Sequence, residues 1–135
     1  MKVENSINPL DIAVSGIKSQ DKSVKAIMSN IANSRTTDAG NGQPYRMIEA
    51  ILKAAEDDEI GGVEIEEIAE DTSDFIRVLS PGHPQADENG YLAMPNVDLP
   101  TEMMNLNLAT KAYQANAAVL KRYQSMVNTS LELLR

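Results

Sequence analysis

The sequence has no cysteine, which excludes disulfide bonds, thiolate metal sites and a cysteine nucleophile. Its single histidine, His83, excludes histidine-rich metal sites and makes any Ser-His-Asp arrangement depend on that one residue. Tryptophan is absent and aromatic residues make up only 4% of the chain, so a large core built from rings is not expected. The apolar residues are mainly Leu, Ile, Val, Ala and Met, a composition typical of helices that pack along a seam.

Basic residues are also scarce, since 12 Lys and Arg stand against 20 Asp and Glu and give a net charge of -8. This deficit argues against a nucleic-acid partner, because few basic side chains are left to neutralise phosphates. No stretch approaches the roughly 20 apolar residues that cross a bilayer. The first residues contain neither an apolar run nor an Ala-x-Ala site, so no cleavable signal peptide is expected.

Half of the acidic residues fall in the segment 56–74, which contains no Lys or Arg. A carboxylate cluster suits hard cations such as Ca²⁺, but the calcium-loop spacing is absent here. The best match starts at Asp87 and places its glycine at the fourth loop position instead of the sixth. We therefore interpret the segment as a solvated acidic surface and predict no metal site and no cofactor.

The N-terminal segment repeats apolar residues in steps of three and four, and only Asp21 interrupts the pattern. The repeating residues are Val3, Ile7, Leu10, Val14, Ile17, Val24, Met28 and Ile31. A period of 3.5 residues is typical of a coiled-coil seam. Pro9 is tolerated only in the first turn of a helix, so we expect a helix of roughly 37 Å from about Asn8 to Asn33.

The C-terminal segment continues the same pattern for longer. The seam residues are Leu99, Met103, Leu106, Thr110, Tyr113, Ala117, Leu120, Gln124, Val127, Leu131 and Leu134. Asp98 is a suitable N-cap and Pro100 fits the first turn, so a helix on the order of 50 Å is predicted. Such a helix must pair along its length, and it should extend beyond the N-terminal one by about ten residues.

The middle of the chain has strand patterns instead of a helical period. Residues 45–53, 62–68, 74–79 and 91–94 are predicted strands, arranged either as one small antiparallel sheet or as a pair of hairpins. A helical turn over 54–59 is an alternative for that piece. The predicted fold class is α+β: helices in 1–33 and 98–135 pair as an antiparallel coiled coil, and residues 34–97 form a small β-containing domain that includes the acidic segment.

The apolar side of the C-terminal helix is wider than one partner helix needs. Further apolar residues lie beside the seam, namely Leu108, Ala112, Ala115, Val119, Tyr123, Met126 and Leu133. The extra width implies lateral packing against other subunits. The predicted assembly interface comprises Leu10, Val14, Ile17, Val24, Met28, Ile31, Leu99, Met103, Leu106, Tyr113, Ala117, Leu120, Val127, Leu131 and Leu134. Before assembly, the two ends of the chain are expected to be frayed.

His83 lies between two prolines in the sequence Pro-Gly-His-Pro. An enzyme using His83 with carboxylates of the acidic segment would need a nucleophile and an orienting partner, and only Ser80 is near in sequence. We interpret His83 as part of a rigid turn and predict no catalytic residue. The Asp-Glu-Asn-Gly sequence that begins at Asp87 is likewise interpreted as a turn, because Asn and Gly accept positive φ.

Several motifs resemble the axial proteins of the bacterial flagellar rod and hook. Ser15-Gly16-Ile17 and residues 30–34 are similar to the opening motif of that family, and residues 81–98 are similar to one proximal rod subunit in particular. The motif residues are Asn30, Ala32, Asn33, Gly82, His83, Pro84, Asp87, Gly90, Tyr91, Pro95, Asn96, Tyr113 and Asn116. The resemblance covers the chain except for residues 56–71.

The resemblance implies a non-enzymatic structural subunit of the proximal rod in the periplasm, within the flagellar basal body. Its terminal helices would form an inner layer around a channel, in a hollow shaft that transmits torque. The implied partners are further copies of the chain, the rod proteins FlgB, FlgF and FlgG, and FliE. Export through the flagellar type III apparatus would explain the missing signal peptide. The alternative is a helical-hairpin binding module, such as an export adaptor or chaperone.

Overall fold

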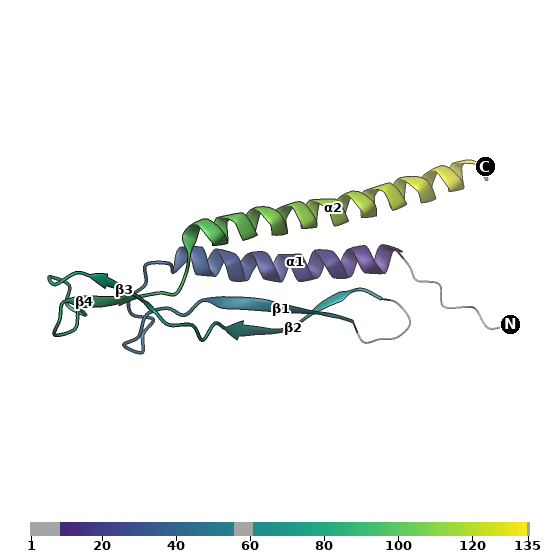
Figure 1. The fold of residues 1–135 in the computed structure, drawn as a ribbon. Coiled ribbons are helices and arrows are strands. Elements are labelled where there is room, and N and C mark those ends of the chain that lie inside the picture. The colour runs from purple at the N-terminus through teal and green to yellow at the C-terminus, as the bar shows by residue number, and fades with distance from the viewer. Residues whose placement is uncertain (1–8, 56–60, 135) are drawn as a thin grey trace.

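The computed structural model describes residues 9–55 and 61–134, and they form an elongated α+β molecule (Figure 1). The elements in chain order are α1 (Pro9–Ala32), β1 (Ile48–Ala54), β2 (Val63–Glu70), β3 (Ile76–Leu79), β4 (Tyr91–Met94) and α2 (Leu99–Glu132). Helix α1 lies between α2 on one side and the β1–β2 hairpin on the other, while β3 and β4 project at one end. The predicted α+β class is confirmed, and the pairing of the helices as a coiled coil stays a prediction.

Local chemistry explains where α1 begins and ends. Pro9 is the first residue of α1, where its missing N–H is not needed. At the other end, the main-chain N–H and the side-chain amide of Asn33 both donate to the carbonyl of Ser29, and the carbonyl of Asn33 then accepts from the N–H of Thr36. The helix has 24 residues, which corresponds to about 36 Å.

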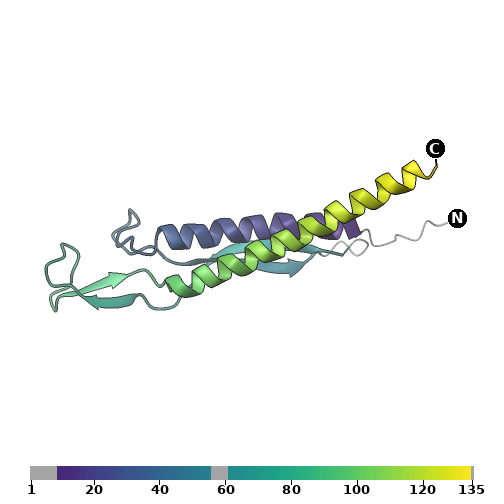
Figure 2. The same ribbon diagram turned by 90° about the horizontal axis from the view of Figure 1, so that it is seen from above.

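Helix α2 begins at the predicted cap. The carboxylate of Asp98 accepts a hydrogen bond of 3.3 Å from the N–H of Thr101, and Pro100 lies in the first turn. The helix then continues for 34 residues, about 51 Å. It runs antiparallel to α1 and is ten residues longer. Figure 2 shows that its C-terminal turns cross over and leave α1.

The strands form two separate antiparallel hairpins, one of the two predicted arrangements. Strands β1 and β2 pair from Ile48↔Glu70 to Ala54↔Val63, with a register shift between Ile51 and Leu52. Strands β3 and β4 pair over four residues, from Ile76↔Met94. Ala54 belongs to β1, so the alternative of a helical turn starting there is wrong, and residues 56–59 of that alternative lie outside the described residues.

The β1–β2 hairpin approaches α1 closely through two serines. The hydroxyl of Ser19 donates to the carbonyl of Val63 at 2.9 Å, and the hydroxyl of Ser15 accepts from the N–H of Val63 at 3.2 Å. A side chain at Gly62 would bring its Cβ to 2.6 Å from the Ser15 oxygen, and the φ of +136° also requires glycine there. The main chain of the hairpin is therefore held against α1 by hydrogen bonds to the two serine side chains.

The apolar residues buried within the described chain are small in number and mostly small in size. They are Ala13, Ala26, Leu92, Pro95, Val97 and Ala109. Large apolar side chains, in contrast, are exposed on every element. The free subunit thus packs its layers by close backbone approach and leaves much of its apolar surface in contact with water.

Candidate assembly surface

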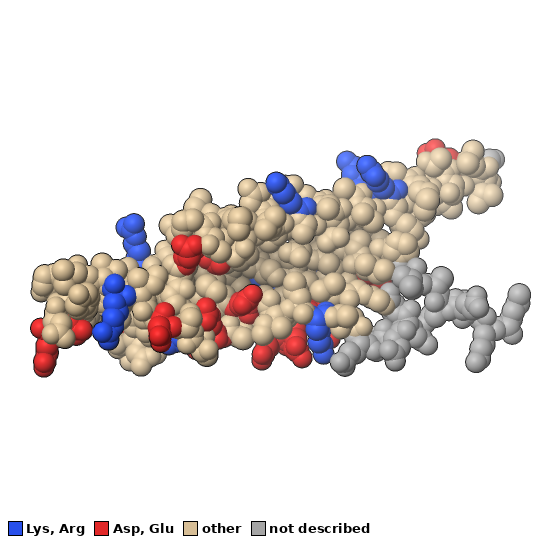
Figure 3. Space-filling model, viewed as in Figure 1, with Lys and Arg blue, Asp and Glu red and all other residues tan. Residues whose placement is uncertain are grey.

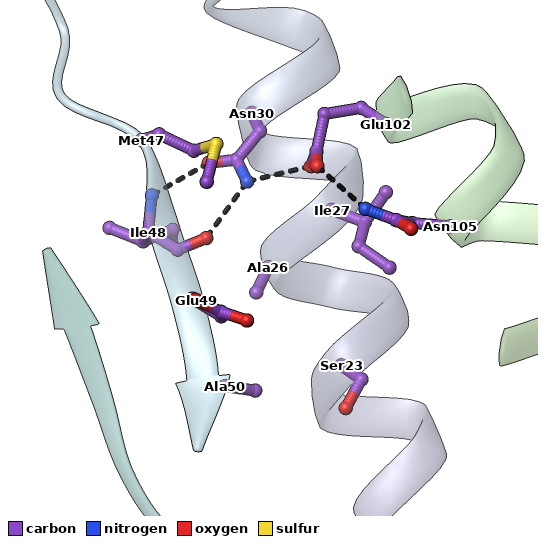
Figure 4. Close-up of a pocket in the computed structure, with 10 residues that line it drawn as sticks. All are labelled: Ser23, Ala26, Ile27, Asn30, Met47, Ile48, Glu49, Ala50, Glu102 and Asn105. Atoms are coloured by element: carbon purple, nitrogen blue, oxygen red, sulfur yellow. Dashed lines mark hydrogen bonds between the residues drawn. The ribbon is translucent and has the colours of Figure 1, made fainter. Parts of the chain in front are cut away.

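Asn30 joins three elements at one buried point (Figure 4). Its side chain is 1% exposed and makes four hydrogen bonds. Its amide nitrogen donates to the carbonyl of Ile48 and to Glu102, both at 2.8 Å, and its oxygen accepts from the N–H of Ile48 and from the hydroxyl of Tyr45, both at 3.0 Å. The residue thereby ties α1 to the first residue of β1 and to the first turns of α2.

Glu102 is the second member of this junction, and it is only 4% exposed. Its second carboxylate oxygen accepts from the amide of Asn105 at 3.1 Å. The carboxyl group also lies near the N-terminus of α2, where the helix dipole favours an acid. The apolar seam could not identify Glu102 as buried, because a glutamate is normally solvent-exposed. The one indication in the sequence that Glu102 has a structural role was its position in the first helical turn after the Asp98 cap.

Asn96 forms a second junction, between the start of β1 and the segment that precedes α2. Its side-chain oxygen accepts from the N–H of Met47 at 2.9 Å, and its amide donates to the hydroxyl of Ser73 at 2.9 Å. The guanidinium of Arg46 donates to the carbonyls of Asp71 and Ser73 and stands 4.3 Å from the ring centroid of Phe75. These contacts fix the end of the first hairpin to the base of the second.

The carboxylate of Asp71 belongs to the same junction. It accepts from the N–H of Ser73 at 2.8 Å and from the Ser73 hydroxyl at 3.0 Å. These two hydrogen bonds, with a smaller contribution from the positive charge of Arg46, lower the pKa of Asp71 below its ordinary value. The ionised form of Asp71 therefore stabilises the folded chain.

The motif residues between β3 and β4 build a turn. One carboxylate oxygen of Asp87 accepts from the N–H groups of Asn89 and Tyr91, each at 2.9 Å. Gly90 is buried at φ +80°, and a Cβ there would lie 3.0 Å from that of Pro81. The ring nitrogen Nδ1 of His83 accepts from the N–H of Gln85 at 3.2 Å. His83 thus has a structural part in the turn.

The remaining motif residues occupy varied positions. Gly82, Pro84 and Tyr91 are exposed on the turn and on β4, Pro95 is fully buried after β4, and Ala32 is the exposed last residue of α1. On α2, Tyr113 is exposed and Asn116 is half-buried. Most motif residues therefore shape the subunit itself, through caps, turns and junctions.

The two helices meet through small and polar residues. A Cβ at Gly16 would lie 2.5 Å from the side-chain amide nitrogen of Asn116, so a larger residue there would force the Asn116 side chain to move. Gly16 precedes Asn30 by 14 residues and Asn116 follows Glu102 by 14, so the antiparallel register is constant over two heptads. Ala109, midway between Glu102 and Asn116, is buried.

The face of α2 that packs on α1 is consequently rotated away from the predicted seam. The predicted residues that are half-buried are Leu10, Val14, Ile17, Val24, Ile31, Leu106, Ala117 and Leu120. Those that are exposed are Met28, Leu99, Met103, Tyr113, Val127, Leu131 and Leu134. Part of the predicted seam is thus exposed in the free subunit, and Glu102, Ala109 and Asn116 lie on the side of α2 that faces α1. The assembly role of the seam residues stays a prediction.

A stripe of apolar side chains runs along the outside of α2. We call this stripe the outer flank; it consists of Met104, Leu108, Ala115, Val119, Met126 and Leu133, all exposed. At 100° per residue its members fall within an arc of about 60°. Ala112 and Tyr123, which the sequence also placed beside the seam, are half-buried instead. The outer flank is therefore available to a neighbour along the length of α2.

The charges divide between the two sides of the molecule (Figure 3). Acidic side chains gather along the β1–β2 side of the face in view, whereas basic side chains stand along α2. Among the described residues, neither helix is long and apolar enough to cross a membrane. The arrangement offers an elongated subunit with packing surfaces along its sides and at its ends.

A family profile described as the C-terminal part of the flagellar basal body rod FlgEFG proteins matches residues 88–133, which include β4 and all of α2. The class of protein that these elements define is thus the flagellar basal-body rod protein. Over 129 residues, the chain is 39% identical to the flagellar basal-body rod protein FlgC of Salmonella typhimurium, with 94% of this chain and 96% of the relative covered.

Two further relatives carry the same name. The FlgC of Yersinia enterocolitica is 37% identical, with 94% of this chain and 96% of the relative covered. The FlgC of Agrobacterium fabrum is 34% identical, with 92% and 91% covered. The chain therefore belongs to the FlgC family of flagellar basal-body rod proteins. It is a structural subunit of the rod and not an enzyme.

Proposed function

We propose that this subunit assembles through its terminal helices into the wall of a hollow shaft that transmits torque. The observation that carries the proposal is the outer flank, which stays exposed although the α1-facing side of α2 is already filled. Full burial of one Leu or Met is worth about 1.5–3 kcal/mol, so several such contacts between subunits offset the entropy of ordering long helices. The exposed seam residues, such as Met103 and Leu131, add to this surface.

The order of the layers supports a radial orientation within that wall. Helix α2 lies on one side of α1 and the acidic β1–β2 hairpin lies on the other. We place α2 toward the channel and the hairpin on the outside of the shaft. The outward acids, such as Glu64 and Glu67, would then be solvated by water instead of being buried between subunits.

The proposed partners are further copies of this chain, the rod proteins FlgB, FlgF and FlgG, and FliE. The proposed location is the periplasmic part of the basal body, reached without a cleavable signal peptide through the flagellar type III apparatus. Two properties favour export of an unfolded chain: it has no cysteine to form disulfides, and few of its described apolar side chains are buried. A small core keeps the free energy of unfolding low.

The test of this proposal is removal of the chain's coding sequence and restoration by a tagged copy. We expect cells without the chain to lack the rod and to lose motility, and the tagged chain to co-purify with intact basal bodies. Complete basal bodies in the absence of the chain would contradict the proposal. Recovery of the chain only in soluble complexes with other export substrates would support the adaptor or chaperone alternative instead.

A further inference from the structure

The chain contains two Asn-Gly pairs, and the structure places them in different surroundings. Asn41-Gly42 lies in the loop that joins α1 to β1, whereas Asn89-Gly90 lies in the turn between β3 and β4 (Figure 1). An asparagine that precedes glycine loses its side-chain ammonia most readily, because glycine has no Cβ to hinder attack by its own main-chain nitrogen. The two pairs share this local chemistry, so any difference between them must come from the fold.

Hydrogen bonds in the first loop engage both reacting groups of the Asn41-Gly42 pair. The N–H of Gly42, which carries the attacking nitrogen, donates to a carboxylate oxygen of Asp38 at 2.9 Å. The side-chain oxygen of Asn41, which gains negative charge when its carbon is attacked, accepts from the N–H of Gln43 at 3.0 Å. A proton acceptor within reach of the nucleophile and a donor at the developing oxyanion both accelerate acyl transfer.

The loop holds this carboxylate in place and still leaves the pair open to water. The same oxygen of Asp38 accepts from the N–H of Gly40 at 2.8 Å, and the N–H of Ala39 donates to the carbonyl of Gln43 at 2.8 Å. Residues 38–43 are all exposed, and a Cβ at Gly42 would meet nothing within 4 Å. Water can therefore reach Gly42 from its open side.

The second pair has neither of these features. Gly90 is buried, and a Cβ there would lie 3.0 Å from that of Pro81. Its N–H donates at 2.9 Å to the main-chain carbonyl of Asp87, which is not a base. The carboxylate of Asp87 accepts instead from the N–H groups of Asn89 and Tyr91. The nitrogen that would attack Asn89 is thus enclosed and has no carboxylate as its proton acceptor.

We propose that Asn41 is a site of self-modification by deamidation, with Asp38 as the proton acceptor. The nitrogen of Gly42 forms a bond to Cγ of Asn41 as its proton passes to Asp38. The bond from Cγ to Nδ2 then breaks, and ammonia leaves with that proton. Water opens the resulting succinimide to an aspartate or an isoaspartate at position 41, so the reaction needs no oxidant and no cofactor. The proposal does not depend on the assembly role of the subunit.

Peptide mapping tests the proposal on the purified, folded chain after incubation at neutral pH. Cleavage after Lys and Arg leaves Asn41 as the only asparagine in the peptide 36–46. Mass spectrometry follows the conversion of amide to acid, and an isoaspartyl methyltransferase identifies isoaspartate. We expect Asn41 to convert at least about tenfold faster than Asn89 in the folded chain, and at a similar rate in urea. Equal rates in the folded chain, or a difference that persists in urea, would overturn the proposal.

Asp38→Asn tests the proton acceptor directly. The new amide oxygen can still accept the loop hydrogen bonds, but the amide cannot take up the proton, so the rate at Asn41 should fall by about tenfold or more. Fragment ions distinguish position 38 from position 41. Asp74→Asn, which makes the same change of charge at another exposed acid, is the matched control and should leave the rate unchanged. An unchanged or higher rate with Asp38→Asn, or an equal fall with Asp74→Asn, would overturn the proposal.

Discussion

Single polar side chains determine how the layers of this subunit are joined. Asn30 uses its whole hydrogen-bonding capacity to connect α1, β1 and α2. Asn96 connects the two hairpins through hydrogen bonds to Met47 and Ser73. A buried polar group is costly when it lacks partners, so such junctions specify one arrangement and disfavour others. The family motif included both asparagines, but their partners could only be seen in the fold.

Asn30→Ala should therefore destabilise the subunit strongly. It removes four hydrogen bonds and leaves the main-chain groups of Ile48 and the carboxyl group of Glu102 with fewer partners. We expect a loss of about 2–4 kcal/mol in the free energy of unfolding, measured with urea. Asn128→Ala, an exposed change on α2, is the control and should stay within about 0.5 kcal/mol. Equal stability of the two variants would contradict the role of the Asn30 junction.

Asp71 should make the free energy of unfolding depend on pH in the acidic range. Its pKa is lower in the folded chain than in the unfolded one, so its contribution is present above the unfolded pKa and is lost as the pH falls through the folded pKa. Asp71→Asn should make the stability less dependent on pH in this acidic range, as measured by urea unfolding at several pH values. Asp74→Asn is the matched exposed control, and an identical flattening by both variants would contradict this assignment.

At the scale of elements, the sequence predicted both helices well because the signals are local. Pro9, Asn33 and Asp98 act through their own hydrogen bonds and ring geometry, so the helix ends could be located without knowing the fold. The packed face of α2 could not be predicted in the same way. The residues that pack there are small or polar, namely the buried Glu102 and Ala109 and the half-buried Asn116. Their packing depends on Gly16 and Asn30 from a distant part of the chain.

The arrangement of the strands could likewise be predicted only in part. Alternating residues indicated where strands lie, but the sequence left open whether they form one sheet or two hairpins. That choice depends on Ser15 and Ser19, which bind the β2 backbone to α1, and on the polar junction at Asn96. The division of the chain at residues 33 and 97 stays a prediction, as does fraying of the ends before assembly.

Gly16→Ala tests the helix contact at this scale. Its new methyl group would overlap the Asn116 side chain, and we expect a loss of about 1–3 kcal/mol from overpacking, measured by urea unfolding. The double variant Gly16→Ala with Asn116→Ala removes the overlapping atoms and should recover part of this loss. If the two single changes simply add in the double variant, the proposed close approach at this position is wrong.

For the whole molecule, we assign intrachain packing and assembly to different faces of α2. Glu102, Ala109 and Asn116 hold α2 to α1, while the outer flank remains for neighbours. Substitutions at Leu106 or Leu120 would disturb both, because these residues are half-buried toward α1. A substitution on the outer flank affects contact with neighbours without affecting the packing of α2 on α1. Leu108, which is 59% exposed, is a suitable residue for this test.

The central claim is tested most directly by the amount of Leu108→Gln that enters purified basal bodies, compared with Lys111→Gln, a variant at another exposed position of α2. Both free subunits should keep the wild-type free energy of unfolding to within about 0.5 kcal/mol, since neither side chain is buried. We predict that Lys111→Gln is incorporated at the wild-type level and that Leu108→Gln is largely lost from basal bodies. Wild-type incorporation of Leu108→Gln, with normal rods, would contradict assembly through the outer flank.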